Sequence, residues 1–201
     1  MKLKQLAIVA IFSFGSPLTH AAAPVFLDDF NSYAATQLNW SPPDSSGWTV
    51  SGGGTVDLIG FGGGFDLLPG NGSYVDLDGS TRNAGLFSTN VNLLGGTTYT
   101  LSFELAGSQR GSSETVNVNF GSMAASYSLI SADPFSTRTL NFIPDTTGSY
   151  SLTYQNAGGD NVGALLDNVS VGIVPEPETY ALMLAGLGMV GCVIRRRKNN
   201  A

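Results

Sequence analysis

Apolar and polar residues alternate with a period of two through the middle of the chain. Residues 98–105 (TYTLSFEL), 115–120 (TVNVNF) and 149–154 (SYSLTY) each place every second residue on an apolar face. This alternation is typical of strands in an antiparallel sheet with one buried face and one wet face. Turn-forming residues such as Gly95-Gly96, Asp133-Pro134 and Gly158-Gly159 separate the runs. The pattern predicts an all-β fold, an antiparallel β-sandwich or jelly roll, over residues 24–173.

The N-terminal segment has a different pattern. Lys2 and Lys4 precede an apolar run from Leu6 to Phe14, and the small residues Ala21-Ala22-Ala23 follow it. A positive start, a short apolar run and a small-residue exit are typical of a secretory signal peptide. We therefore expect residues 1–22 to be a signal peptide, with cleavage at or just after Ala21.

The C-terminal segment has three consecutive parts. Residues 174–178 are Val-Pro-Glu-Pro-Glu, residues 179–194 carry no charge, and residues 195–198 are Arg-Arg-Arg-Lys. As a helix, Tyr180–Ile194 covers about 22 Å, which is shorter than the hydrocarbon core of about 30 Å. The cationic cluster still favours a transmembrane helix over 179–194, because it would stay in the cytoplasm while the β domain lies outside.

This order of parts resembles the PEP-CTERM sorting domain over residues 174–198. Val174, Pro175, Glu176 and Pro177 match the sorting motif, and a basic stop follows, which consists of Arg195, Arg196 and Arg197. The resemblance implies recognition by an exosortase, a membrane-embedded protease-transpeptidase, after passage through the secretion machinery. It also implies a Gram-negative bacterium that makes exopolysaccharide or biofilm. The expected locations are an inner-membrane precursor and then the cell surface or extracellular matrix.

The charge distribution limits the partners of the β domain. Between residues 24 and 173 the sequence holds three basic residues and thirteen acidic ones. An acidic surface repels polyphosphates, so nucleic acid is excluded as a partner. The same surface is compatible with hydrated exposure or with cation binding.

The β segment also resembles galactose-binding-like jelly rolls. The residues that carry the resemblance are the opening stretch 28–31 (DDFN), the strands 72–77 (GSYVDL) and 96–103 (GTTYTLSF), and the closing strand 166–171 (LDNVSV). In carbohydrate-binding relatives, acids of the opening and closing strands hold a structural calcium. The resemblance therefore implies one Ca²⁺ at Asp28 or Asp29 and Asp167.

Alternation predicts that Asp167 shares a face with Leu165, Val169 and Val171. A carboxylate among apolar neighbours needs either a cation or several hydrogen bonds. A calcium ligand and an acceptor of main-chain N–H groups are the two alternatives for this residue.

The side-chain inventory disfavours catalysis. His20 and Cys192, the only His and Cys of the chain, lie in the terminal segments, so the β domain lacks the groups for Ser-His or Cys-His catalysis and for zinc binding. Carboxylates such as Asp76 and Asp78 remain, as in glycosidases, but acids two apart on a strand are more typical of turns or calcium sites. We therefore expect a protein that is not an enzyme.

Two tryptophans have two interpretations. Exposed Trp40 and Trp48 would stack on sugar rings, whereas buried ones would belong to the core, where large aromatic residues dominate sandwich interiors. The leading hypothesis is an exported surface or matrix protein that binds exopolysaccharide. The alternatives are a structural or adhesive module with protein partners and a carboxylate-dependent glycan-cleaving enzyme.

Overall fold

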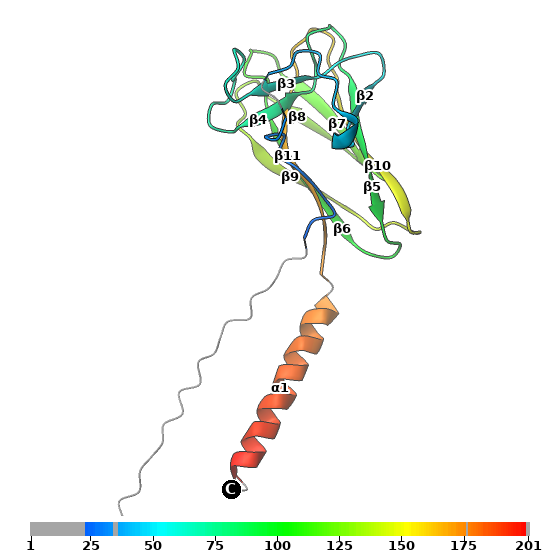
Figure 1. The fold of residues 1–201 in the computed structure, drawn as a ribbon, viewed down its shortest axis with the longest axis vertical. Coiled ribbons are helices and arrows are strands. Elements are labelled where there is room, and N and C mark those ends of the chain that lie inside the picture. Colours follow the sequence, from blue (N-terminus) through cyan, green and yellow to red (C-terminus); the bar gives the residue numbers. More distant parts are fainter. Residues whose placement is uncertain (1–22, 34–35, 176, 200–201) are drawn as a thin grey trace, which may run out of the picture.

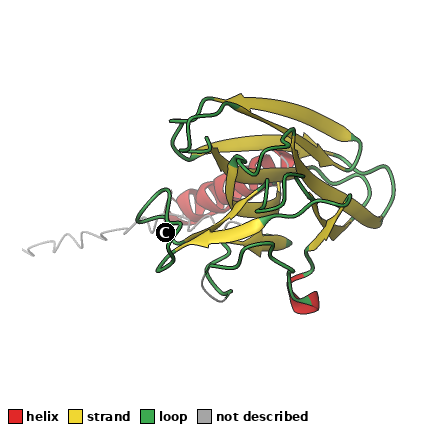
Figure 2. Cartoon of the chain, turned by 90° about the horizontal axis from the view of Figure 1, so that it is seen from above, coloured by secondary structure: helices red, strands yellow, loops and turns green. Residues whose placement is uncertain are grey.

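The structure, a computed structural model, describes residues 23–33, 36–175 and 177–199. Eleven strands form two antiparallel sheets packed face to face, and an α-helix projects from the sandwich near its C-terminal end (Figure 1). Viewed from above, the two layers of strands are separate (Figure 2). The predicted all-β sandwich is confirmed, and the predicted signal peptide at 1–22 lies outside the described residues.

The first sheet contains the strand that ends the β domain. Its strands are β1 (Phe26–Asp28), β3 (Asp57–Gly60), β4 (Ser73–Asp76), β6 (Tyr99–Ala106), β9 (Ser136–Phe142) and β11 (Leu165–Ile173). Their order is β3-β4-β11-β6-β9, and β1 pairs with β11 outside this path. The first and last strands of the domain are therefore neighbours.

The second sheet has the order β2-β5-β10-β7-β8. Its strands are β2 (Thr49–Ser51), β5 (Leu86–Leu93), β7 (Glu114–Phe120), β8 (Met123–Leu129) and β10 (Gly148–Asn156). From β4 onward the chain changes sheets at every connection except the β7–β8 hairpin. This repeated crossing is the jelly-roll arrangement that the regular spacing of short strands predicts.

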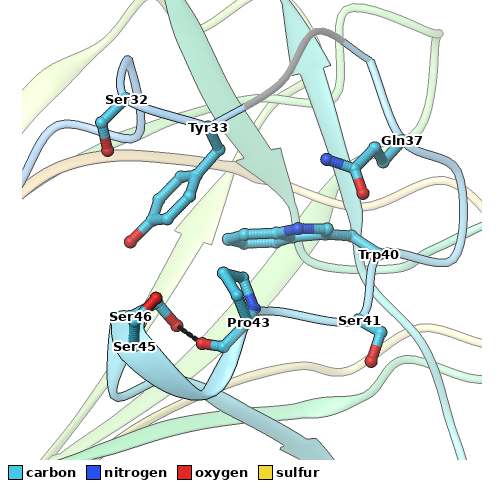
Figure 3. A pocket seen from close by; sticks show the side chains of 8 residues that line it. All are labelled: Ser32, Tyr33, Gln37, Trp40, Ser41, Pro43, Ser45 and Ser46. Carbon is cyan, nitrogen blue, oxygen red and sulfur yellow. Dashed lines mark hydrogen bonds between the residues drawn. The ribbon is translucent and has the colours of Figure 1, made fainter.

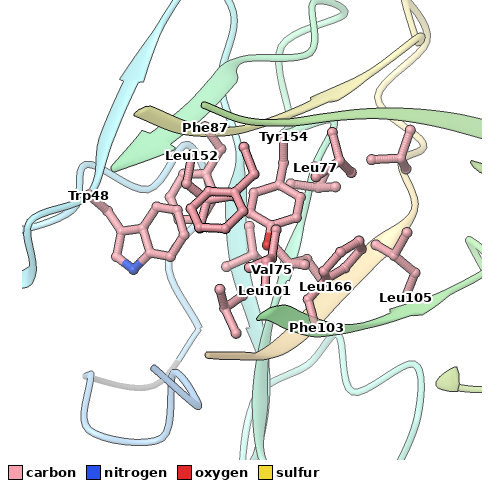
Figure 4. Packing of buried hydrophobic residues seen from close by; sticks show 14 of the residues in the cluster. Trp48, Val75, Leu77, Phe87, Leu101, Phe103, Leu105, Leu152, Tyr154 and Leu166 are labelled. Carbon is pink, nitrogen blue, oxygen red and sulfur yellow. The ribbon is translucent and has the colours of Figure 1, made fainter. Parts of the chain in front are cut away.

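The core lies between the two sheets. In β6 and β7 every second side chain is fully buried, as the alternation predicts. Figure 4 shows Leu101 and Phe103 of β6 beside Tyr154 of the second sheet. In the same core the ring of Trp48 stacks on Phe87 at 4.1 Å between centroids. Full burial of a side chain of this size stabilises the fold by about 1.5–3 kcal/mol. The opposite face of the first sheet carries a smaller apolar cluster around Tyr74 and Ile59.

A β-bulge in β11 changes the face of its side chains. The register with β6 shifts after Asp167, and Asn168 has a left-handed backbone, with φ of 50°. Val169 and Val171 lie in the core between the sheets, whereas Leu165 lies in the smaller cluster on the opposite face. Simple alternation is therefore wrong for Val169 and Val171, because the extra residue of a bulge reverses the facing of the strand beyond it.

The C-terminal helix α1 spans Pro177–Asn199. It includes the predicted helical range 179–194 and continues through the basic cluster. The hydrogen bond from Val174 N to Thr98 O, at 2.9 Å, ties the start of the segment to the sheet. Of the helices in the described residues, none has the apolar length that crossing a membrane requires.

Candidate functional site

Asp28 organises the opening of the β domain. Its Oδ1 accepts the Phe30 main-chain N–H at 2.8 Å. Its Oδ2 accepts the Tyr33 hydroxyl at 2.6 Å and the Trp48 Nε1–H at 2.8 Å. Burial and the hydrogen bond to Asp28 raise the pKa of the Tyr33 hydroxyl. The carboxylate thus joins the first strand to two aromatic rings.

Asp167 is 2% exposed and lies on β11 beside the bulge. Its Oδ1 accepts the Asn168 main-chain N–H at 2.6 Å. Burial raises the pKa of Asp167 to about 7; this hydrogen bond opposes the shift, and the negative charges of Glu104, Asp29 and Asp28 add to it. The charges of Asp28 and Asp29 in the opening stretch therefore act on Asp167 in the closing strand.

The three acids that were predicted to bind calcium differ in how well they suit a metal ion. Three donors already satisfy Asp28, and the exposed Asp29 accepts the Asn31 main-chain N–H at 3.1 Å. In the described part of the chain, no three His, Cys, Asp or Glu side chains are grouped so that they could hold a metal ion. Of the three acids predicted to bind calcium, only Asp167 is both buried and surrounded by negative charges that a cation would offset. Calcium stays a prediction that rests on this residue.

Tyr33 and Trp40 form one side of an open hollow of about 570 Å³, which we call the basin (Figure 3). Their rings lie 5.0 Å apart between centroids at 55°. Ser45 and Ser46, in a short 3₁₀ turn, place hydroxyl groups on the opposite rim, and the Ser46 hydroxyl donates to Pro43 O at 2.7 Å. The residues that line the basin are uncharged.

Both tryptophans belong to the core. Trp40 is 3% exposed and Trp48 is 2% exposed, so neither ring presents an open face to a sugar. Trp40 contributes to the wall of the basin, and Trp48 is fixed by Phe87 and Asp28. The structure thus agrees with the core interpretation of these residues.

The outer face of the second sheet carries a continuous array of uncharged polar side chains. We call this array the polar sheet face. On the described strands of this sheet, apart from Leu86 and Ala124, each outward position holds Ser, Thr, Asn or Gln. These positions are Thr49 and Ser51 on β2, Ser88, Asn90 and Asn92 on β5, Ser149, Ser151, Thr153 and Gln155 on β10, Thr115, Asn117 and Asn119 on β7, and Ser126 and Ser128 on β8.

The polar sheet face is hollowed and only partly paired with itself. A hollow of about 430 Å³ lies over Asn117, Asn119 and Ser126. The Asn119 amide donates to the Thr153 hydroxyl at 3.1 Å, and the Thr49 and Ser88 hydroxyls are 2.9 Å apart. Amide and hydroxyl groups both donate and accept, so such a face suits a hydroxyl-rich ligand without charge.

The alternating runs in the sequence already indicated part of the polar sheet face. The same pattern that predicts the strands also places Asn117, Asn119, Ser149 and Ser151 on one outward face. The signal was therefore present, but joining the strands into one face required the pairing of β7 with β10 and of β10 with β5. The basin had no such signal, because its walls come from loops.

The C-terminal segment matches a known sorting motif. Residues 174–198 match the model of the PEP-CTERM protein-sorting motif. The chain carries a PEP-CTERM sorting motif. The PEP-CTERM match includes Val174, Pro175, Glu176 and Pro177 as well as Arg195, Arg196 and Arg197. This motif implies export and processing from a membrane-anchored precursor.

Solved structures resemble the β domain in fold. The CBM22-1 xylan-binding domain of Paenibacillus barcinonensis Xyn10C superposes with a TM-score of 0.55 at 13% identity, covering 78% of this chain and 97% of that domain. The CBM22-1-CBM22-2 tandem domain of the same protein gives a TM-score of 0.52 at 15% identity, covering 81% of this chain and 49% of the tandem. At these identities the similarity concerns the fold. No curated protein matches the sequence.

Proposed function

We propose that this chain is an exported, non-enzymatic protein of the cell surface or extracellular matrix of a Gram-negative bacterium. Its β domain binds neutral exopolysaccharide on the polar sheet face. Its PEP-CTERM segment holds the precursor at the inner membrane until exosortase processing.

The observation that carries the ligand class is the absence of charge on the polar sheet face within a strongly acidic domain. Solvated surfaces usually mix both charge signs. A surface of small amide and hydroxyl groups avoids the cost of desolvating charges when a ligand covers it. Sugar hydroxyls can replace the water on these groups one for one. The fold shared with a xylan-binding domain supports the same ligand class.

The test is binding to matched neutral and acidic polysaccharides. Full-length protein, kept in detergent, should be retarded in gels that contain xylan or dextran and should not be retarded by alginate. A double substitution, Asn117→Ala with Asn119→Ala, removes two amides from the hollow and should weaken retardation at least about tenfold, since the loss of 1.4 kcal/mol is a factor of ten.

A matched control is the pair Ser41→Ala and Ser45→Ala, which removes hydroxyls from the basin instead. If this pair weakens binding while the asparagine pair does not, the basin is the site. Equal retardation by neutral and acidic gels would contradict the proposed ligand class. Retention of protein partners by a variant that has lost sugar binding would favour an adhesive module, and polysaccharide turnover would favour an enzyme.

A further inference from the structure

A third hollow, a smaller pocket, lies on the first sheet, away from the polar sheet face. It has a volume of about 190 Å³ and is built on strands β3 and β4. One wall is apolar and includes Leu38, Ile59 and Phe65. The other is polar and includes Asp57, Asp76 and Arg110. The volume is below the range of about 300–1,000 Å³ that drug-sized ligands occupy, so a single small ring suits it.

The polar wall places two carboxyl groups side by side. Asp57 on β3 and Asp76 on β4 are direct cross-strand partners, and both are buried. Directly opposed like charges on neighbouring strands destabilise a sheet. The arrangement therefore needs compensation from other groups.

Hydrogen bonds compensate Asp57 in part. Its Oδ1 accepts the main-chain N–H groups of Asn39 and Ser80 at 2.6 and 3.1 Å. Its Oδ2 accepts the Ser80 hydroxyl at 2.7 Å. Among donors in the described residues, that hydroxyl alone contacts Oδ2, so this oxygen can accept a further hydrogen bond.

Arg110 compensates Asp76. Its guanidinium forms an ion pair with Asp76 and also donates to Asn161 O at 3.0 Å. Burial raises the pKa of Asp76 to about 8 although Arg110 and the Asp78 main-chain N–H oppose the shift, and the charges of Asp57 and Asp78 add to it. One cation is therefore too little positive charge for this wall.

The neighbouring Asp78 adds a third buried carboxyl group and so increases the shortage of positive charge. It is 0% exposed, and neither of its carboxylate oxygens has a hydrogen-bond partner among the described residues. Burial raises the pKa of Asp78 first of all, and the charges of Asp160 and Glu114 raise it further, whereas the positive charge of Arg110 opposes the shift. Asp78 does not itself line the pocket. Three buried carboxyl groups nevertheless share the charge of one guanidinium, so a further cation beside Asp57 and Asp76 would be stabilised.

The apolar wall restricts which cation fits. Phe65 is 51% exposed at the rim, and Leu38 is also exposed. A metal ion gains nothing from such a wall, whereas the C–H face of a sugar ring packs on it, and a cation is attracted to an aromatic face. The occupant suited to both walls is a ring with one apolar face and an ammonium group.

We infer that this pocket binds a single amino-sugar residue with a free, protonated amine, with the ammonium at Asp57 and Asp76 and the ring against Phe65. The site is independent of the polar sheet face. The pocket would bind a terminal or branch residue of a polysaccharide, or one residue of a short oligosaccharide.

The experiment is a calorimetric titration of the full-length protein, in detergent, with a glucosamine tetramer. The N-acetylated tetramer, which lacks the ammonium groups, should bind at least about tenfold more weakly. Phe65→Ala should lower the affinity for the glucosamine tetramer by a similar factor. Phe61→Ala is the matched control, because Phe61 is 74% exposed and does not line the pocket.

Asp57→Asn keeps the shape of the side chain and removes its charge. This variant should therefore reduce the difference in affinity between the glucosamine tetramer and the N-acetylated tetramer. If this variant fails to fold, the comparison of Phe65→Ala with Phe61→Ala still tests whether the sugar ring binds in the pocket. Equal affinity for the two tetramers, equal effects of the two phenylalanine variants, or displacement of the tetramer by Ca²⁺ would each overturn the inference. The Asn117→Ala, Asn119→Ala variant should titrate normally, so failure here is distinct from failure of the neutral polysaccharide proposal.

Discussion

Asp167 shows how one buried acid couples the fold to pH. Its pKa is raised to about 7 in the folded chain, above the ordinary value of 3.8. Asp76 has a pKa raised to about 8 for the same first cause, burial. Both groups bind a proton more tightly when folded, so their stabilising contribution is complete below about pH 3.8 and is lost as the pH rises through 7 to 8.

We therefore expect the melting temperature to fall as the pH rises from 5 to 8.5 in the presence of EDTA. At this domain size, each 1 kcal/mol lost lowers Tm by about 2–4 °C. Asp167→Asn cannot ionise and should flatten this decline. Thermal melts at three pH values measure the effect, and a wild-type Tm that rises with pH would contradict it.

Calcium provides the second arm of the same experiment. A cation at Asp167 would favour the ionised carboxylate, so added Ca²⁺ should raise the wild-type Tm most at the highest pH. Asp167→Asn and Asp167→Ala should both remove that increase. If Ca²⁺ leaves the wild-type melt unchanged at every pH, the calcium prediction is wrong and the Asn168 N–H group is the relevant partner of Asp167.

At the scale of elements, the main chain after β6 approaches a neighbouring segment too closely for a side chain. Gly107 directly follows β6, and a Cβ there would overlap the carbonyl oxygen of Ile130. Gly107→Ala should therefore lower the free energy of unfolding by about 1–3 kcal/mol through overpacking. Gly148→Ala is the control at the start of β10, where the nearest atom to a Cβ is 4.0 Å away. Equilibrium urea unfolding compares the two, and an equal loss would refute the steric account.

The strands themselves could be predicted because their signal is local. Alternation in residues 98–105, 115–120 and 149–154 determines β6, β7 and β10 without reference to the rest of the chain. The bulge at Asn168 could not be predicted this way, because a left-handed residue leaves the apolar and polar letters unchanged. Asp57 and Asp76 meet only through the register of β3 with β4, which no local pattern encodes.

For the whole molecule, we expect the C-terminal segment to determine how the protein is sorted in the cell. The PEP-CTERM match spans residues 174–198, directly after β11. In the native host we expect processing near Pro175, so the intact mass of the mature protein should lack α1. Replacing Pro175 and Pro177 with Ala should leave the tail attached. A wild-type chain that is recovered freely soluble without detergent, and uncut near Pro175, would contradict the sorting account.

The position of β11 has a consequence for the timing of export. This strand lies inside the first sheet, between β4 and β6, and it also pairs with β1, yet it is the last strand to be synthesised. If the chain is exported as proposed, the first sheet lacks the strand that joins its two halves until Ile173 has emerged from the translocation pore. On the proposed sorting route, closure of the domain would coincide with arrival of the tail at the bilayer, so the exosortase would meet its substrate when the cargo acquires its final shape.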